Sequence, residues 1–270
     1  MIELLVVIGI IGVLASLLLT ALSGAKSRAR SVTCKNHLHQ ISLALQMYVN
    51  EHQSRYPYYW TTDTDPSLEG AIGRDNSRWW WAKLIPYYPV KWTNATHHCP
   101  GYKGAINGCV MTQSASGQQN VPFGSYAYNS EGVAVPAVPG TPFAAGLGLG
   151  PPQDQVVMGH GRLRSAVTPE PRIKVPSEML AIGESRFLNA KVNGTLGGCD
   201  RLTCGLLKSS NPWHSFAWYA FDPARHGRSY NVTFCDGHIE ALNPWVLFDP
   251  SKTAAMWNSD HQPHPEFWVP

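Results

Sequence analysis

A long apolar run at the start of the chain constrains the fold more than any other feature. No charged side chain occurs from Leu4 to Leu22, and about 20 consecutive apolar residues are what an α-helix needs to cross a bilayer core. One carboxylate, Glu3, stands at the head of the run, where an ionised group entering hydrocarbon costs about 3 kcal/mol unless a positive group pairs with it. The sequence therefore predicts a membrane-length helix whose acid needs a partner.

Three interpretations of this run compete. A cleaved secretory signal carries a basic region before a shorter apolar run, whereas no Lys or Arg precedes Lys26, so we expect the segment to be retained. A plain membrane anchor accounts for the length but gives Glu3 no role. In the third interpretation the helix leaves the membrane and packs against copies of itself, and a positive group on a neighbouring subunit neutralises Glu3. We favour the third interpretation because it explains both the length of the apolar run and the carboxylate of Glu3.

Beyond the apolar run the helical pattern continues and becomes amphipathic. Apolar residues recur at spacings of four and three, on one stripe of a helix: Cys34, Leu38, Ile41, Leu45 and Tyr48. The pattern predicts one helix from Met1 to about Asn50, roughly 75 Å long at 1.5 Å per residue. We expect two domains: an N-terminal helix over 1–52, with an assembly or membrane segment (1–24) and a half docked on the head (25–52), and a head over 53–270.

The head is expected to be rich in strands and loops, because Pro, Gly and aromatic residues replace the helical period after Arg55. The sequence predicts a short helix within Trp79–Tyr88 that Pro86 ends, a long loop over 133–152, and strands over Arg172–Pro176 and Met179–Gly183. The dipeptide Asp236-Gly237 predicts a tight hairpin between Asn231–Cys235 and His238–Leu242. The predicted fold class is α+β, with a long N-terminal helical stem packed on an antiparallel, β-rich head.

Charge and cysteine content limit the partners and the compartment. A formal net charge of +3 is too small and too dispersed to indicate a nucleic-acid partner. Six Cys, an even number, favour a disulfide framework in an oxidising compartment, which places the head outside the cytoplasm. Three basic residues directly after the span favour the opposite orientation: Lys26, Arg28 and Arg30. We give the cysteines more weight.

The run Ile2–Ile8, followed by Ile10-Ile11 and Leu17-Leu18-Leu19, resembles the N-terminal segment of type IV pilins and pseudopilins. In that family a prepilin peptidase cuts after a glycine, the new N-terminal phenylalanine is methylated, and a glutamate five residues into the mature chain pairs with the terminal amine of the next subunit. The resemblance implies that Glu3 is this glutamate, although Met1 falls at the third mature position and the family's glycine, phenylalanine and threonine are absent. It implies an assembly surface made of Glu3, Leu4, Leu5, Val6, Val7, Ile8, Ile10, Ile11 and Leu14.

A second motif strengthens the resemblance. His226, nine intervening residues and Asp236-Gly237 are similar to the H-x9-DG motif of a pilin-like family of unknown function that is abundant in planctomycetes and verrucomicrobia. The companions of the motif are Asn36-His37-Leu38, Trp80 to Tyr87, Cys99-Pro100, Tyr126 with Asn129, and Gly183-Glu184-Ser185.

Two roles are open for the motif residues. Asp236 and His226, with Glu184 or His238, form a candidate Zn or Ca site, because carboxylate and imidazole groups suit these ions. Alternatively, Asp236 makes the turn, and His226 holds the hairpin through a backbone carbonyl. We favour the structural role, so no cofactor is expected. A zinc site at His97-His98-Cys99 with Cys109 is disfavoured because a C-x2-C pair is lacking.

For the cysteines, we expect Cys199 and Cys204 to close a small disulfide loop, with half of a metal clip as the alternative. Cys34 facing Cys99, which leaves Cys109 for Cys235, is our first choice among the 15 pairings that six Cys allow.

The predicted function is that of a structural subunit, not an enzyme, in a type IV pilus-like extracellular filament. The expected partners are identical subunits in a helical filament, the inner membrane before assembly, a prepilin peptidase and the assembly machinery. One alternative is a membrane-anchored minor pseudopilin, or a ligand- or cargo-binding surface protein, of a type II secretion-like system. Another is a metal-dependent surface enzyme that uses His226 and Asp236; no nucleophile elbow is present.

Overall fold

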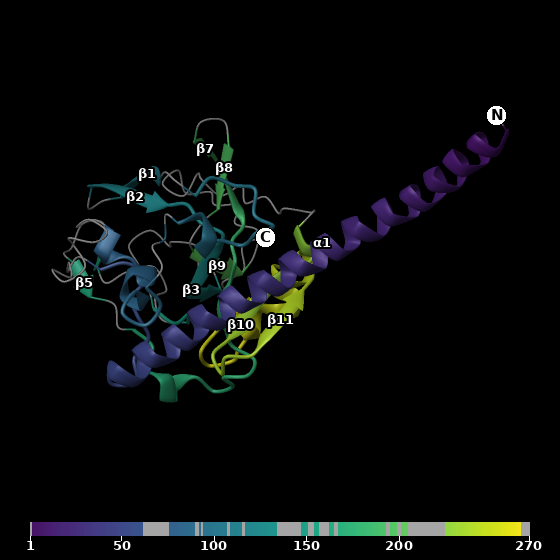
Figure 1. Ribbon diagram of the computed structural model, residues 1–270. Coiled ribbons are helices and arrows are strands. Elements are labelled where there is room, and N and C mark those ends of the chain that lie inside the picture. The colour runs from purple at the N-terminus through teal and green to yellow at the C-terminus, as the bar shows by residue number, and fades with distance from the viewer. Residues whose placement is uncertain are drawn as a thin grey trace.

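The computed structural model describes most of the stem and the centre of the head (Figure 1). The described residues are 2–61, 76–89, 92, 94–106, 109–114, 117–133, 147–150, 154–156, 162–164, 167–192, 195–198, 201–204 and 225–265.

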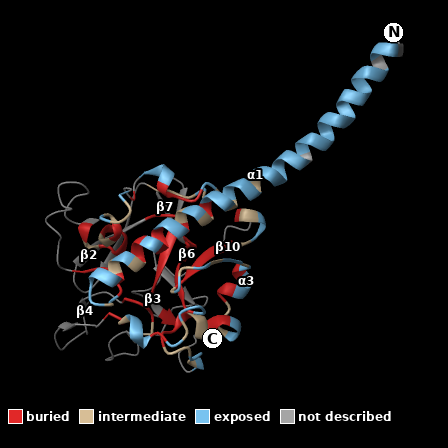
Figure 2. Cartoon of the chain, turned by 60° about the horizontal axis from the view of Figure 1, so that its bottom comes forward, coloured by how far each residue is buried: buried red, intermediate tan, exposed pale blue. Residues whose placement is uncertain are grey.

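A single helix, α1 (Ile2–Glu51), makes up the N-terminal part of the chain and confirms the predicted stem. Its first half projects away from the head (Figure 2), and no described side chain before Cys34 is buried. The second half lies across the head and buries the predicted stripe at Leu38, Ile41 and Leu45, while Tyr48 is half-buried. The helix ends where Gln53 and Ser54 adopt positive φ angles of 58° and 54°, a left-handed conformation that stops many helices.

The centre of the head is a five-stranded sheet with the order β11-β10-β6-β3-β9. Four strands pair in antiparallel fashion, and β9 joins the edge parallel to β3. The strands are β3 (Tyr126–Val133), β6 (Leu180–Glu184), β9 (Arg201–Cys204), β10 (Tyr230–Phe234) and β11 (Ile239–Leu242). The β10–β11 hairpin confirms the Asp236-Gly237 prediction, with Gly237 at a φ of 94°. Stem and sheet together confirm the α+β class.

Smaller elements surround the sheet. Three two-stranded sheets pair β1 (Cys109–Ser114) with β2 (Gly117–Pro122), β4 (Asp154–Val156) with β5 (Arg162–Arg164), and β7 (Phe187–Val192) with β8 (Thr195–Gly198). The short helices are η1 (Asn76–Arg78), η2 (Trp80–Leu84), η3 (Ala95–His97), η4 (Glu170–Arg172), η6 (Arg225–Gly227), α3 (Pro244–Leu247), α4 (Pro250–Thr253) and η7 (Ala254–Trp257).

Two apolar clusters hold these layers together. The larger one lies between α1, the tryptophan-rich η2 and the sheet, and it includes Leu38, Ile41, Trp80, Tyr126 and Tyr128. The smaller one joins β10 to the C-terminal helices and includes Tyr230, Phe234, Leu247, Phe248 and Trp257. The sheet is thus covered on both sides, which explains why β6 and β10 are buried at every residue.

One sequence prediction needs correction, and another is confirmed as a 3₁₀ helix. Arg172–Pro176 is not a strand: it begins in the 3₁₀ turn η4 and continues into a turn in which Glu178 N–H donates to the Val175 carbonyl. Pro171 fixes a turn-like φ and Pro176 offers no N–H to a neighbouring strand, so turn geometry prevails over the β-branched residues between them. The helix predicted within Trp79–Tyr88 is the 3₁₀ helix η2, which ends before Pro86. Of the loop predicted over 133–152, residues 134–146 and 151–152 lie outside the described part.

Replacing Leu38 tests whether the docked half of α1 carries head stability. Leu38 is fully buried, so we expect Leu38→Ala to lower the free energy of unfolding by about 2–5 kcal/mol through lost burial and the cavity left behind. Leu43→Ala is the matched control, because Leu43 lies on the same half of the helix but is 42% exposed; it should cost less than about 1 kcal/mol. Urea unfolding of the full chain in detergent, followed by tryptophan fluorescence, measures both. Equal losses would contradict the docking.

Candidate functional site

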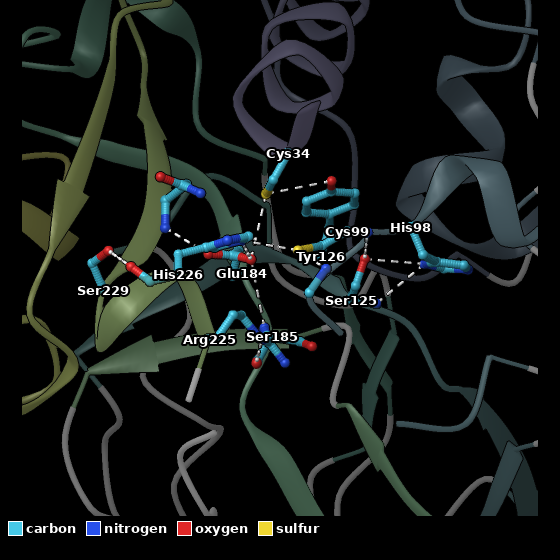
Figure 3. Close-up of polar contacts among 12 residues, drawn as sticks. Cys34, His98, Cys99, Ser125, Tyr126, Glu184, Ser185, Arg225, His226 and Ser229 are labelled. Atoms are coloured by element: carbon cyan, nitrogen blue, oxygen red, sulfur yellow. Dashed lines mark hydrogen bonds and ion pairs between the residues drawn. The ribbon is translucent and has the colours of Figure 1, made fainter. Parts of the chain in front are cut away.

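Four possible metal ligands meet where α1 leaves the head. Cys34 comes from α1, Cys99 from the loop after η3, Glu184 from the end of β6 and His226 from η6, and one ligand atom of each lies within 4.8 Å of the others. Figure 3 shows Cys34 pointing from the helix toward the side chains of the head. Among the described residues, no other group of three or more His, Cys, Asp or Glu side chains has this arrangement.

The contacts within this cluster are short. His226 Nε2 lies 3.0 Å from Cys99 Sγ and 3.0 Å from Glu184 Oε1, and Cys34 Sγ lies 3.4 Å from the same Oε1 (Figure 3). The side chains of Glu184 and His226 are 0% and 1% exposed. Two thiols, a carboxylate and an imidazole therefore converge on one buried point.

Neighbouring donors fix three of the four groups. Gly101 N–H donates to Cys99 Sγ at 3.3 Å, and the Tyr126 hydroxyl donates to Cys34 Sγ at 3.6 Å. The other oxygen of Glu184, Oε2, accepts from Asn231 N–H at 2.7 Å. These bonds orient the sulfurs and leave Oε1 directed into the cluster.

The backbone at the cluster is shaped for close approach. His226 adopts a left-handed conformation (φ 46°, ψ 37°), which costs a non-glycine residue about 1–2 kcal/mol. At Gly101, a Cβ atom would lie 3.0 Å from Cε1 of His226 and 3.5 Å from Cys99 Sγ. The strained histidine and the missing side chain together allow the imidazole to reach the thiol.

Charges around Glu184 favour its ionised form. Burial alone would raise the pKa of this carboxyl, but the hydrogen bond with His226 and the guanidinium of Arg225, 3.8 Å from Oε1, lower it below its usual range. Burial would lower the pKa of His226, whereas hydrogen bonds with Cys99 and Glu184 raise it to about 9. The hydrogen bond with Cys34 is the main cause of a lowered pKa at Cys99, and burial raises that of Cys34.

The cluster does not have the geometry of a nucleophilic triad. In such a triad the base contacts the nucleophile through one ring nitrogen and the orienting acid through the other. Here the same atom, His226 Nε2, faces both Cys99 and Glu184. The arrangement is suited to holding an ion at the point of convergence.

The structure separates Asp236 from His226 and Glu184, the other residues of the tentative metal site. Asp236 Oδ1 accepts from His238 N–H at 3.1 Å and lies 2.6 Å from His238 Nδ1, on the exposed tip of the hairpin. The tentative set of His226, Asp236 and Glu184 is therefore corrected: only His226 and Glu184 meet. His226 contacts side chains through Nε2 rather than a carbonyl, so the predicted role of Asp236 as a turn residue agrees with the structure and that of His226 does not.

The structure brings Cys34 and Cys99 together, as the sequence predicted, but holds both as free thiols. Cys235 is also a free thiol, so its predicted bond with Cys109 is not formed. Burial raises its pKa to about 12, and it lies in hydrogen-bond contact with Tyr56. The side chains of Cys109, Cys199 and Cys204 lie outside the described residues.

Both ends of the H-x9-DG motif contact the stem. His226 meets Cys34 in the cluster, and at Gly237 a Cβ atom would lie 2.7 Å from Nε2 of Gln46. Between them, the Thr233 hydroxyl donates to Ser42 Oγ at 3.1 Å. The hairpin therefore runs along the docked half of α1, and His226, Thr233 and Gly237 are among the residues at which this segment approaches the helix.

The histidines beside Cys99 are not part of the cluster. His98 donates through Nε2 to the Trp92 carbonyl at 2.6 Å and accepts the Ser125 N–H through Nδ1 at 3.2 Å. His97 lines a small aromatic cavity with Trp80, Trp81 and Trp92, and neither of its ring nitrogens has a hydrogen-bond partner among the described residues. Burial lowers its pKa to about 3.

The predicted assembly residues lie on the projecting half of α1. Glu3 is exposed in its first turn. Leu4, Val6, Val7, Ile8, Ile10, Ile11 and Leu14 are exposed by between 52% and 70%, and the Leu5 side chain lies outside the described part of the structure. By length and composition this part of the helix can cross a membrane.

Comparison with known proteins gives one match. Residues 23–89, which include the docked half of α1, Cys34 and η2, match the model of a family described as "Protein of unknown function (DUF1559)". No curated protein and no solved structure matches the chain. The docked half of the stem and the adjoining tryptophan segment are thus similar to a family described as having no known function.

Acid should destabilise the head through His97. The native state keeps this imidazole neutral down to about pH 3, whereas the unfolded chain takes up a proton below about pH 6.5. Because the unfolded state then binds more protons, stability should fall by about 1.4 kcal/mol per pH unit as the pH drops below 6.5. His97→Phe should reduce this slope in urea unfolding between pH 6.5 and 4. His39→Phe, on an exposed part of α1, is the control and should follow the wild type; an unchanged slope in His97→Phe would contradict the assignment.

Proposed function

We propose that the protein is a non-catalytic, pilin-like structural subunit that is held in the inner membrane by the first half of α1 and then assembles into an extracellular filament through the same segment. One observation carries the proposal: about half of the helix is apolar and projects from the head, and its side chains are exposed among the described residues.

The exposed segment requires an apolar partner. Leu4, Leu18 and Leu19 are exposed by 68–70%, and fully burying a leucine side chain stabilises it by about 1.5–3 kcal/mol. Lipid and the helices of neighbouring subunits can both supply this burial. A helix that exchanges lipid contacts for contacts with neighbouring helices is what a subunit needs if it is first held in the membrane and then assembles into a filament.

Small residues and the single acid favour helix contacts as the final state. At Gly9 and Gly12 a Cβ atom would meet none of the described residues within 4 Å, so no contact among these residues requires glycine there. Glycine lets neighbouring helices approach closely. Glu3 would be neutralised by the terminal amine of an adjacent subunit, and this pair would set the register between subunits.

The alternative is an anchored protein that does not polymerise on its own, such as a minor pseudopilin or a ligand- or cargo-binding surface protein. Lys26, Arg28 and Arg30 flank the apolar segment, as basic residues flank many anchors. An anchor explains the span and leaves Glu3 without a function. The role of Glu3 therefore separates the two proposals.

Removing the acid tests the filament. We expect Glu3→Ala to abolish or disorder filaments, because the pair that sets the register is lost, while the protein still reaches the membrane and the head stays folded. Glu240→Ala is the control, since it removes the same charge from the exposed face of β11 and should leave filaments unchanged. Electron microscopy of material sheared from cells measures assembly, and membrane fractionation measures anchoring. Normal filaments from Glu3→Ala would refute the proposal that Glu3 sets the register between subunits. Wild-type protein found in the membrane without filaments would favour the anchored protein that does not polymerise.

A further inference from the structure

We propose that Cys34, Cys99, Glu184 and His226 bind one Zn²⁺ ion, which clips the stem helix to the head at the point where the helix emerges. The site is independent of filament assembly, because its ligands lie in the head and in the docked half of α1.

The spacing of the ligand atoms fits a tetrahedral ion. Zinc lies about 2.0–2.3 Å from nitrogen, oxygen and sulfur ligands, so the ligand atoms themselves lie roughly 3.3–3.8 Å apart. The contacts of 3.0 Å and 3.4 Å in the cluster are close to this range, and no pair exceeds 4.8 Å. Small side-chain movements would bring all four atoms to bonding distance.

The ligand types select the ion and its role. Calcium prefers six to eight oxygen ligands, whereas thiolate and imidazole ligands favour zinc. Four protein ligands fill a tetrahedral shell and leave no position for water or substrate, which is typical of structural zinc. On binding, each thiol loses its proton to solvent and becomes a thiolate, and His226 releases any proton on Nε2 to solvent and binds as a neutral imidazole.

The surrounding charge balances a divalent ion. Two thiolates and the Glu184 carboxylate carry three negative charges, and the guanidinium of Arg225, 3.8 Å from Glu184, carries one positive charge. A divalent cation makes the buried group neutral. This matters because an unbalanced charge in a buried site costs several kcal/mol.

The second layer of contacts agrees with metal ligation. The N–H of Gly101 and the hydroxyl of Tyr126 point at the two sulfurs, and the N–H of Asn231 occupies only Oε2 of Glu184. Donors of this kind orient ligands and stabilise their charge in metal sites. Glu184 is thereby positioned to bind through Oε1 alone.

The site lies at the base of the projecting helix, where a bound ion would hold the stem to the head. Cys34 is the first buried residue of α1 among those described, and the other ligands come from three distant segments of the head. An ion bound here joins four segments of the chain at the base of the projecting helix. The expected result is a head that holds the stem rigidly at its exit.

Metal content tests the site directly. Full-length protein purified in detergent without chelators should contain one Zn²⁺ per chain by atomic emission, and Co²⁺ substitution should give the visible absorption bands of a tetrahedral thiolate site. Cys34→Ser, Cys99→Ser and Glu184→Gln should each lose stoichiometric binding. Cys235→Ser is the matched control: it removes a thiol that is free among the described residues but lies outside the cluster, and it should keep the ion and the spectrum.

A second measurement on the wild type keeps the proposal testable if variants fail to fold. Alkylation of the native protein should modify Cys34 and Cys99 many times faster after a chelator is added, and Zn²⁺ should restore their protection. Two results would overturn the proposal. One is a wild-type chain that binds neither Zn²⁺ nor Co²⁺, and the other is a Cys34–Cys99 disulfide, detected by mass spectrometry after alkylation under denaturing conditions without reductant.

Discussion

The burial of one stripe of α1 against the sheet is the interaction on which the rest of the structure depends. Leu38, Ile41 and Leu45 fill the space between the helix, the tryptophans of η2 and the sheet. Isolated helices are marginal in water, and most helical stability comes from packing an apolar face. The docked turns of α1 gain this stability from the head. The same contact brings Cys34 to the head and gives the β10–β11 hairpin a surface to lie along.

Local patterns in the sequence were sufficient to predict the outline of the fold. The spacing of Leu38, Ile41 and Leu45 predicted the docked face of the stem, and Asp236-Gly237 predicted the hairpin, because both signals lie within a few residues. The prediction of a strand over Arg172–Pro176 was wrong because the prolines favour turn geometry there, despite the apolar residues between them. The strand β3 was not predicted, since a strand buried on both faces lacks the alternation that marks a half-exposed one.

The candidate site shows the limit of motif reasoning. From the sequence, His226 and Glu184 were named as possible metal ligands. Cys34 and Cys99 were placed near each other, but as the two halves of a disulfide. The four residues are spread from position 34 to position 226, and only the packing of α1 on the sheet unites them. Asp236 was grouped with His226 because the two share a motif, but its carboxylate bonds within its own turn. A thiol on the buried stripe, together with Cys99-Pro100-Gly101, was the signal that could have indicated a shared ion.

The unbroken course of α1 has a geometric consequence for any assembly built from this subunit. Because the projecting and docked halves belong to one helix, the direction that the head faces is fixed relative to the apolar surface of the stem. Each residue inserted or deleted between the halves would turn one against the other by about 100° and shift it by about 1.5 Å. Seven residues would nearly restore the orientation, leaving a rotation of about 20°. The number of residues between Leu22 and Cys34 thus fixes the rotation of the head about the helix axis. This rotation determines which part of the head faces outward in an assembly.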